Sequence, residues 1–301
     1  MLPSDFTRLV AICFIWSVNV VIGRVIIADL GTPPLLYALL RFALVAALLY
    51  RYLRPVPKPF GRMVIVGLLM GAGHFGLLFL GLQNASPSTA AIVVQFGIPS
   101  TAILSVLVLG ERMSVQRVLG VSIAFAGVLL VMWTPGGLPP SLGASFVLAA
   151  ALALSVGSIL MKQMPRIAPL RLQAWVSLVS IAPLALLSAV TEPVPVAHLL
   201  GGGWALLAAV VFSAVIVTIV AHTGYYRLLQ LYDASTIAPL TLMMPVMTVG
   251  LGVVFTGDDV NLKMLAGSVM ALGGVALILV PAGRRPALAA GDAADHPRRA
   301  P

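Results

Sequence analysis

The sequence predicts an all-α integral membrane protein with ten transmembrane helices, arranged as two inverted repeats of five helices. Hydrophobic residues make up 60% of the 301 residues and charged residues only 9%, whereas a soluble domain is about 25% charged. Ten apolar runs follow one another, and the second half of the chain repeats the design of the first. Lysine and arginine gather in alternate connections between the runs. Together these features exclude an ordinary soluble domain.

Each apolar run is long enough to be a membrane span, because about 20 apolar residues cross a hydrocarbon core ~30 Å thick. The first run leads on without a small-residue cleavage site, so we expect it to be retained rather than removed as a signal peptide. The runs cover residues 6–28, 33–53, 61–83, 86–109, 115–132, 142–162, 170–190, 203–229, 234–255 and 261–281.

An internal repeat divides the chain. Pro245 follows Pro99 by 146 residues, each in a long apolar run that ends in a short turn. Two pairs of glycines continue the match at a spacing of 147 residues: Gly120 with Gly267, and Gly127 with Gly274. Self-similarity at a fixed spacing indicates fused structural units.

We therefore expect a first repeat at 1–135, a second at 136–281 and a flexible cytoplasmic tail at 282–301. Five spans in each half force the second half to enter the membrane from the opposite side. The halves are then inverted repeats, an architecture typical of secondary transporters with a binding site near the midplane.

The basic residues predict the orientation. Fifteen of the 18 lysines and arginines fall on one predicted side, only Lys263 falls on the other, and Arg24 and Arg41 lie within spans. Basic loops stay cytoplasmic, so both termini are predicted to be in the cytoplasm, with the protein in the inner (plasma) membrane. The net charge of +9 is thus a signal of topology and of contact with membrane lipid, and predicts no nucleic-acid partner.

Several short motifs of the first half are distinctive: Trp16-Ser-Val-Asn19, Pro34 with Arg41-Phe42, Ala85 to Ala90, Pro99, the turn Leu-Gly-Glu111-Arg112-Met-Ser, Gly120 and Gly127. In the second half, Thr-Gly-Asp258-Asp stands in the place of Leu-Gly-Glu111, so Asp258 could take the role of the acid. These motifs resemble the EamA-type family of the drug/metabolite transporter superfamily, over about residues 1–281. The resemblance implies transport of a small molecule, and is strongest to bacterial exporters of amino acids, including aromatic ones.

No enzyme is predicted. The four histidines lack metal-ligand spacing, and the chain has no GxxxxGK[ST] phosphate loop. We therefore expect no cofactor, no metal and no ATPase subunit, with transport energy taken from gradients.

The resemblance implies a cavity between spans 1, 3, 4, 6, 8 and 9, and on that basis we choose candidate pathway residues. Span 3 offers His74, Phe75 and Phe79, and span 8 offers His222 and Tyr226 in matched places. An ionisable group in the membrane points by default to a pathway. A neutral histidine that bonds between helices is the structural alternative.

Polar and aromatic residues in spans 1 and 4 are further candidates. Trp16 and Asn19 could form an aromatic wall and an amide contact, or an interhelical hydrogen bond. Gln95 lies four residues before Pro99, where proline frees a backbone carbonyl. Pro99 and Pro245 are predicted hinges of the gates, with static kinks as the alternative.

Two cations in matched places, Arg24 and Lys162, are predicted at the two mouths of the path, where they would attract a carboxylate. Snorkelling to the interface is the alternative. Arg41 has no counterpart in the second half and no acidic residue lies deep in any span, so Arg41 requires an acceptor from a neighbouring helix.

The predicted function is export of neutral or aromatic amino acids and related small metabolites, by alternating access of the two halves. A lining of aromatics, amides and histidine without a deep carboxylate suits a zwitterion with an apolar side chain. Uniport-like movement is favoured over proton coupling, because a histidine in a dry site stays neutral. The alternatives are drug or organic-cation efflux by proton antiport, and a non-transporting membrane scaffold or lipid-handling protein.

Overall fold

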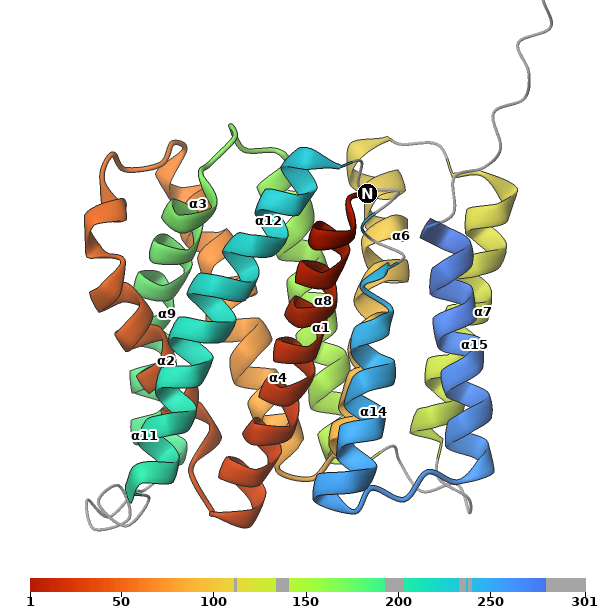
Figure 1. Ribbon diagram of the computed structural model, residues 1–301. Coiled ribbons are helices and arrows are strands. Elements are labelled where there is room, and N and C mark those ends of the chain that lie inside the picture. Colours follow the sequence, from red (N-terminus) through yellow and green to blue (C-terminus); the bar gives the residue numbers. More distant parts are fainter. Residues whose placement is uncertain (111–112, 134–140, 193–202, 233–236, 238–239, 280–301) are drawn as a thin grey trace, which may run out of the picture.

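A computed structural model shows a bundle of helices that stand roughly parallel to one another (Figure 1), with no strand in the part of the chain that it describes. The structure describes residues 1–110, 113–133, 141–192, 203–232, 237 and 240–279. The predicted turn at Glu111 and the predicted tail at 282–301 lie outside these residues.

Eight helical segments are long and apolar enough to cross a membrane, which confirms an all-helical membrane fold for the described residues. Several are not α-helical throughout, because π-helical or 3₁₀ turns interrupt them. The segments are α1 with η1 (Pro3–Arg24, Val25–Asp29), α3 with η3 and α4 (Phe60–Gly67, Leu68–Gly73, His74–Leu82), α5 with η4 and α6 (Pro87–Val93, Val94–Phe96, Gly97–Leu109), α7 (Val115–Met132), α8 (Leu142–Lys162), α9 (Pro169–Thr191), α11 with η5 and α12 (Gly203–Val211, Phe212–Ala221, His222–Leu231) and α15 (Leu262–Leu279).

Two shorter apolar helices, α2 (Pro34–Leu48) and α14 (Met243–Thr256), occupy the places of the predicted second and ninth spans. The second run was expected to continue to residue 53. Instead α2 ends at Leu48 and a 3₁₀ turn, η2 (Tyr50–Leu53), follows it. The count of ten membrane spans stays a prediction.

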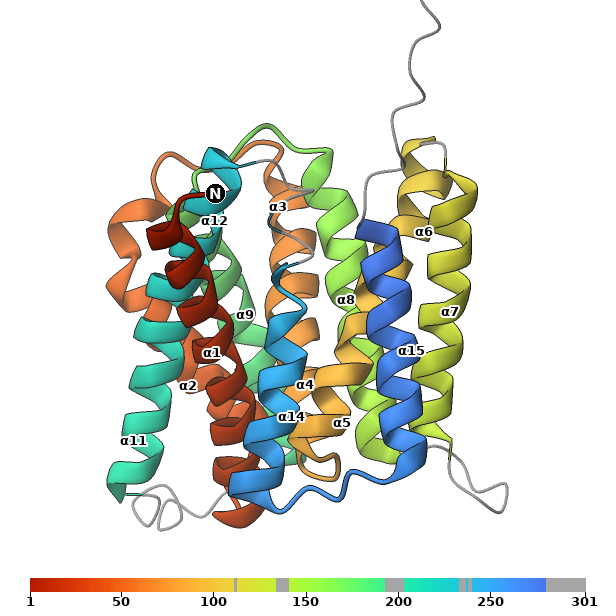
Figure 2. The ribbon, with the colours of Figure 1, turned by 45° about the vertical axis from the view of Figure 1, so that its right-hand side comes forward.

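Successive segments run in opposite directions through the bundle (Figure 1), as the alternation of predicted spans requires. The chain starts on the same side of the bundle on which α15 ends, and Figure 2 shows the same arrangement after a 45° turn. We call this the N-terminal side.

Contacts between helices repeat in the two halves. The contact of α1 with α14 corresponds to that of α8 with α6, and the contact of α4 with α8 corresponds to that of α12 and η5 with α1. Two contacts join equivalent helices, α2 with α9 and α7 with α15. Two repeats related by a two-fold axis would produce this pattern, and the domain boundaries at 135 and 281 stay predictions.

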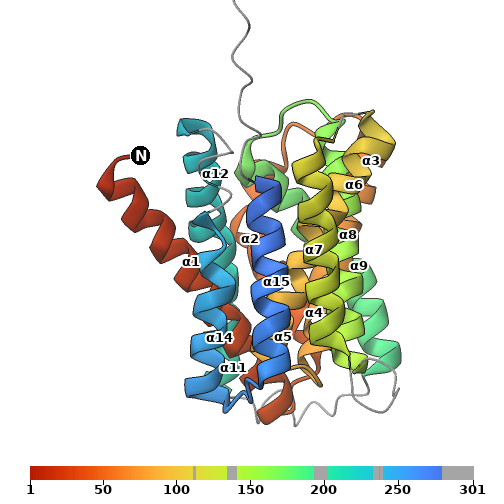
Figure 3. The same cartoon turned by 90° about the vertical axis from the view of Figure 1, so that its right-hand side faces the viewer.

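The glycines that mark the repeat pack α7 against α15, which stand side by side in all three views of the bundle (Figures 1, 2 and 3). A Cβ atom on Gly127 would lie 2.3 Å from the backbone nitrogen of Ala271. A Cβ atom on Gly274 would lie 2.3 Å from the backbone nitrogen of Ala124. Small residues let the two backbones approach closely, which is how helices associate without a hydrophobic driving force.

Two carboxylates tie loops to helix starts on the side opposite the N-terminus. Asp258 Oδ2 accepts a hydrogen bond of 2.8 Å from the Ser88 backbone at the start of α5. Glu192 accepts from the backbone of Leu35 and Leu36, at 2.8 and 3.0 Å, at the start of α2. Acids stabilise helix N-termini because the first N–H groups are unpaired and the helix dipole is positive there.

Candidate functional site

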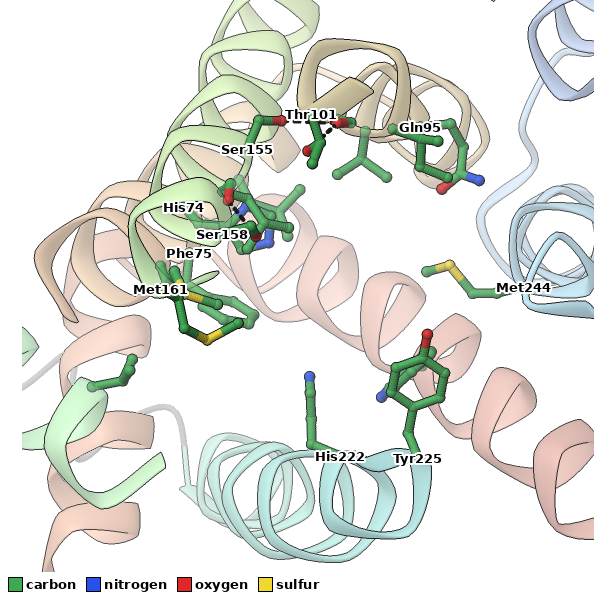
Figure 4. Close-up of a pocket in the computed structure, with 18 of the residues that line it drawn as sticks. His74, Phe75, Gln95, Thr101, Ser155, Ser158, Met161, His222, Tyr225 and Met244 are labelled. Atoms are coloured by element: carbon green, nitrogen blue, oxygen red, sulfur yellow. Dashed lines mark hydrogen bonds between the residues drawn. The ribbon is translucent and has the colours of Figure 1, made fainter. Parts of the chain in front are cut away.

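A cavity of about 830 Å³ lies between the helices of both halves, within the range of small-molecule sites. Figure 4 shows the side chains that face it from several helices. The lining reaches Lys162 and Leu279 at helix ends, and Met113 in the turn before α7, all on the N-terminal side. It includes no residue of the turns 30–33, 83–86 and 257–261 on the opposite side. Among the described residues, the cavity lining therefore reaches the N-terminal side and not the opposite one.

His74 and His222, both predicted pathway residues, line this cavity from equivalent spans. Each is the first residue of an α-helix that directly follows a π-helical segment, η3 before His74 and η5 before His222. Short π-helical segments are rare and occur preferentially at functional sites. Neither π-helical segment could be predicted from the sequence, because its residues are as apolar as those of the flanking helices.

Backbone carbonyls fix both imidazole rings. His74 Nδ1 donates to the Ala150 oxygen at 2.9 Å, and His222 Nδ1 donates to the Val217 oxygen at 2.6 Å. A carbonyl can only accept, so the proton of each neutral ring lies on Nδ1, and Nε2 is left as an acceptor. Figure 4 shows His222 directed into the cavity. The two rings therefore present acceptors to a solute.

Aromatic rings stand beside both histidines. Trp16 contacts His222 and Tyr225, with ring centroids 5.3 and 5.2 Å apart, and Phe75 lies against His74 at 4.7 Å. Trp16, Phe75 and Tyr225 line the cavity. These faces suit an apolar or aromatic portion of a solute.

Two predicted aromatic residues have other positions. Phe79 is fully buried against Tyr37, with ring centroids 4.9 Å apart, and is not among the lining residues, because the cavity ends near Leu78. Tyr226 lies in α12, but its side chain is outside the described part of the structure. Its neighbour Tyr225, which was not predicted, lines the cavity.

Polar atoms of α1 lack partners at the cavity wall. Trp16 Nε1 and Asn19 Oδ1 are buried and have no hydrogen-bond partner among the described residues. The two residues are three apart, so they share one face of α1. Buried polar atoms without a partner are costly, so this donor and this acceptor are suited to contact a bound solute.

The prolines follow breaks in their helices. Pro99 is the third residue of α6, and this helix directly follows the 3₁₀ turn η4, which contains Gln95. Pro245 is likewise the third residue of α14. Proline cannot donate to the carbonyl four residues earlier, and so neither helix continues upstream as a regular α-helix. Gln95 lines the cavity, whereas both prolines are buried outside its lining.

The two predicted mouth cations differ in their surroundings. Arg24 Nη1 donates to the carbonyls of Leu82 and Gln83, at 2.8 and 2.7 Å, and is not part of the lining. Arg24 therefore caps the C-terminal end of α4, where the helix dipole favours a cation. Lys162 lines the cavity at the end of α8 on the N-terminal side.

Arg41 is the principal lining residue that was not predicted to belong to the site. It is fully buried in α2, with 0% of its surface exposed. Its Nε and Nη2 donate to the Thr218 hydroxyl at 3.2 and 2.8 Å, and its guanidinium carbon lies 4.1 Å from the centroid of the Phe75 ring. The sequence signal was an isolated deep arginine without an acid.

Small polar side chains complete the wall on the side of α6 and α8. Thr101, Ser155 and Ser158 line the cavity there (Figure 4), and each hydroxyl donates to a carbonyl of its own helix. Their oxygens are left as weak acceptors. The methionines Met161 and Met244 add flexible apolar surface.

Comparison with known proteins decides the family. The sequence model of the EamA-like transporter family matches residues 7–133 and, separately, residues 141–280. The chain belongs to this family. As an EamA-like transporter with eight apolar helical segments of spanning length, it is a multi-pass membrane transporter.

Individual relatives are more distant. A probable amino-acid metabolite efflux pump of Salmonella typhimurium is 28% identical over 270 residues, covering 87% of this chain and 90% of the relative. A protein of the same description from Escherichia coli is 25% identical and covers 91% of this chain and 94% of the relative. A solved crystal structure with 21% identity aligns with a TM-score of 0.59 over 92% of this chain and 96% of that chain, which supports the fold alone.

Proposed function

We propose that this EamA-like transporter exports neutral and aromatic amino acids and related small metabolites by alternating access. The observation that carries the proposal is the cavity of about 830 Å³, which both halves line and whose described lining reaches the N-terminal side and not the opposite one. A site closed on one side and reached from the other is what one state of an alternating-access cycle requires. The two relatives named as probable amino-acid metabolite efflux pumps support the same class of solute.

The lining chemistry favours a zwitterion. Arg41 supplies positive charge, whereas Asn19 Oδ1 and the histidine Nε2 atoms supply acceptors for an ammonium group. No carboxylate lines the cavity in the described part of the chain, which disfavours an organic cation as the main solute. We place the N-terminal side in the cytoplasm of the inner membrane on the strength of the basic loops, so that the cavity takes up solute from inside the cell.

Reconstitution of the full chain into proteoliposomes tests this function. Vesicles loaded with labelled L-phenylalanine, L-leucine or L-threonine are expected to release at least one of them faster than protein-free vesicles. Ala102→Trp, which fills the cavity from α6, should abolish the release. Leu107→Trp on the same helix, where Leu107 is 74% exposed, should preserve it. Equal release with and without protein for every solute would refute the proposal.

A further inference from the structure

Arg41 brings a permanent positive charge into the cavity wall without an acid to balance it. Guanidinium groups stay charged in proteins, and a charge taken out of water without a partner is strongly destabilising. The ion pair found among the described residues joins Arg8 to Asp5 near the N-terminus, away from the cavity. Among the described residues, the fully buried charge of Arg41 therefore has no carboxylate partner.

We propose that the Arg41 guanidinium is a carboxylate-binding subsite, which pairs with the acid group of the transported solute. The inference rests on the proposed transport function and adds the group by which the solute is selected. The solute class is a small carboxylate with an apolar portion, and an uncharged or purely cationic solute is excluded.

The hydrogen bonds of Arg41 occupy only some of the N–H groups of its guanidinium and leave others available to a solute. Nε and Nη2 donate to the same acceptor, the Thr218 oxygen, whereas Nη1 is buried and has no partner among the described residues. Arginine prefers to bind carboxylates through two parallel N–H groups. Nη1 with the second N–H of Nη2 provides such a pair.

Thr218 holds the Arg41 guanidinium in place. Its hydroxyl donates to the Ser213 carbonyl at 2.9 Å, five residues earlier in the π-helical segment η5, so its lone pairs are left for Arg41. Thr218 lies one turn before His222, and Phe75, the ring beneath the guanidinium, directly follows His74. Arg41 is thus anchored beside both histidines, from the two halves of the chain.

Phe75 lies against the proposed subsite, so that a carboxylate binds there only after a rearrangement. Its ring lies over the guanidinium and Arg41 has no exposed surface, so a carboxylate reaches Nη1 only after the side chains around the guanidinium, the Phe75 ring among them, rearrange. Bidentate pairing of a guanidinium with a carboxylate is among the strong charge-assisted interactions, so a bound acid compensates for the loss of the cation–π contact. A solute that bears the acid would therefore stabilise a rearranged cavity, and one that lacks it would not.

A series of matched solutes on the wild-type chain tests the subsite. The probes are L-phenylalanine, 3-phenylpropanoate without the ammonium group, and L-phenylalaninamide without the carboxylate. Thermal stabilisation of the purified protein and inhibition of labelled L-phenylalanine flux are measured for each. Both acids are expected to act at concentrations about 10- to 100-fold lower than the amide, the range for hydrogen bonds to charged groups. Equal action of acid and amide, or no stabilisation by either acid, overturns the proposal.

Variants locate the preference at Arg41. Arg41→Gln should remove the difference between acid and amide, and Arg41→Lys should retain part of it. Thr218→Val, a change at a positioning residue, should weaken acid binding while the amide is unaffected. Arg62→Gln is the matched control, because Arg62 donates to the Gln163 carbonyl at the exposed surface. A folded Arg41→Gln protein that still prefers the acids overturns the subsite.

The outcome separates the two proposals. Stabilisation by the acids through Arg41, without protein-dependent flux of any amino acid, leaves the subsite in place and refutes amino-acid export. Flux of L-phenylalanine and its amide with equal efficiency supports transport and refutes the subsite.

Discussion

His74 and His222 are related as equivalents of the two halves: each begins an α-helix after a π-helical segment, and each donates Nδ1–H to a backbone carbonyl. The carbonyls differ in kind. That of Ala150 belongs to another helix, α8, whereas that of Val217 lies five residues earlier in the same segment. His74 therefore ties two spans together, and His222 holds its own π-helical segment. We expect substitution of His74 to perturb helix packing more than substitution of His222 does.

The contact of α7 with α15 predicts opposite effects for two adjacent glycines. Gly274→Ala would bring a Cβ atom to 2.3 Å from the Ala124 nitrogen, so the helices must separate. Overpacking of this kind costs about 1–3 kcal/mol. Gly273→Ala meets nothing within 4 Å and replaces a poor helix former with a good one. Unfolding temperatures in detergent should fall for the first variant and stay or rise for the second, and equal falls would contradict the packing role.

The contact of Asp258 with the start of α5 is predicted to keep the cavity closed on the side opposite the N-terminus. Asp258→Asn removes the charge that holds the Ser88 N–H at the start of α5, a contact of the kind worth about 0.5–2 kcal/mol. Because it joins the loop after α14 to α5, we expect the variant to open this side more often. Labelling of a cysteine introduced at Leu78, with Cys13 replaced, measures that opening when a membrane-impermeant thiol reagent is added only on the side opposite the N-terminus.

The adjacent acid is the control for this change. Asp259 is exposed. Asp259→Asn therefore removes the same charge from the same loop but leaves the hydrogen bond to the start of α5 intact. Its labelling rate should match that of the parent protein. A rise of equal size in both variants would assign the effect to loop charge rather than to the cap.

The prolines predict a kinetic effect. Pro99→Ala with Pro245→Ala restores a backbone donor to each broken helix, and both helices can then straighten upstream. We expect flux of the transported amino acid to slow more than its binding weakens, because the breaks act in the exchange between states. Comparison of flux with thermal stabilisation by the same solute separates the two effects. Unchanged flux in the double variant would leave the prolines as static kinks.

The repeat could be predicted from the sequence because the glycines that mark it are required by the close packing of two helices. Gly120, Gly127, Gly267 and Gly274 keep their spacing because each faces a backbone across the contact of α7 with α15. Composition likewise predicts the apolar helices, since a helix pairs its backbone polar groups within the segment and long apolar runs can therefore lie in lipid.

The site was predictable only in part. His74 and His222 stood out as ionisable groups in apolar runs, which is rare enough to indicate function. The π-helical segments carry no compositional mark, and the repeat alignment did not select Tyr225, which lines the cavity. Phe79 shares a helical face with Phe75, but the length of the cavity along that face depends on packing with Tyr37. Arg41 was recognised as unpaired, and only its position beside Thr218 and Phe75 connects it with the cavity.

The energetics of transport form the last prediction. Proton-coupled transporters carry a titrating group in the membrane, and His74 is the best-placed candidate in the described part of the chain. In the structure it is buried, with 7% of its surface exposed, and donates Nδ1–H to the Ala150 carbonyl. A ring fixed in this way acts as a neutral donor and acceptor. We therefore expect uniport-like movement down the solute gradient, and no uphill accumulation of the transported amino acid in vesicles with an imposed pH gradient. His74→Gln retains an N–H donor for Ala150 and cannot titrate, so it should keep most of the downhill flux, and His222→Gln should behave likewise. Uphill movement driven by a pH gradient in the parent protein, lost in His74→Gln while downhill flux persists, would show instead that His74 carries the proton.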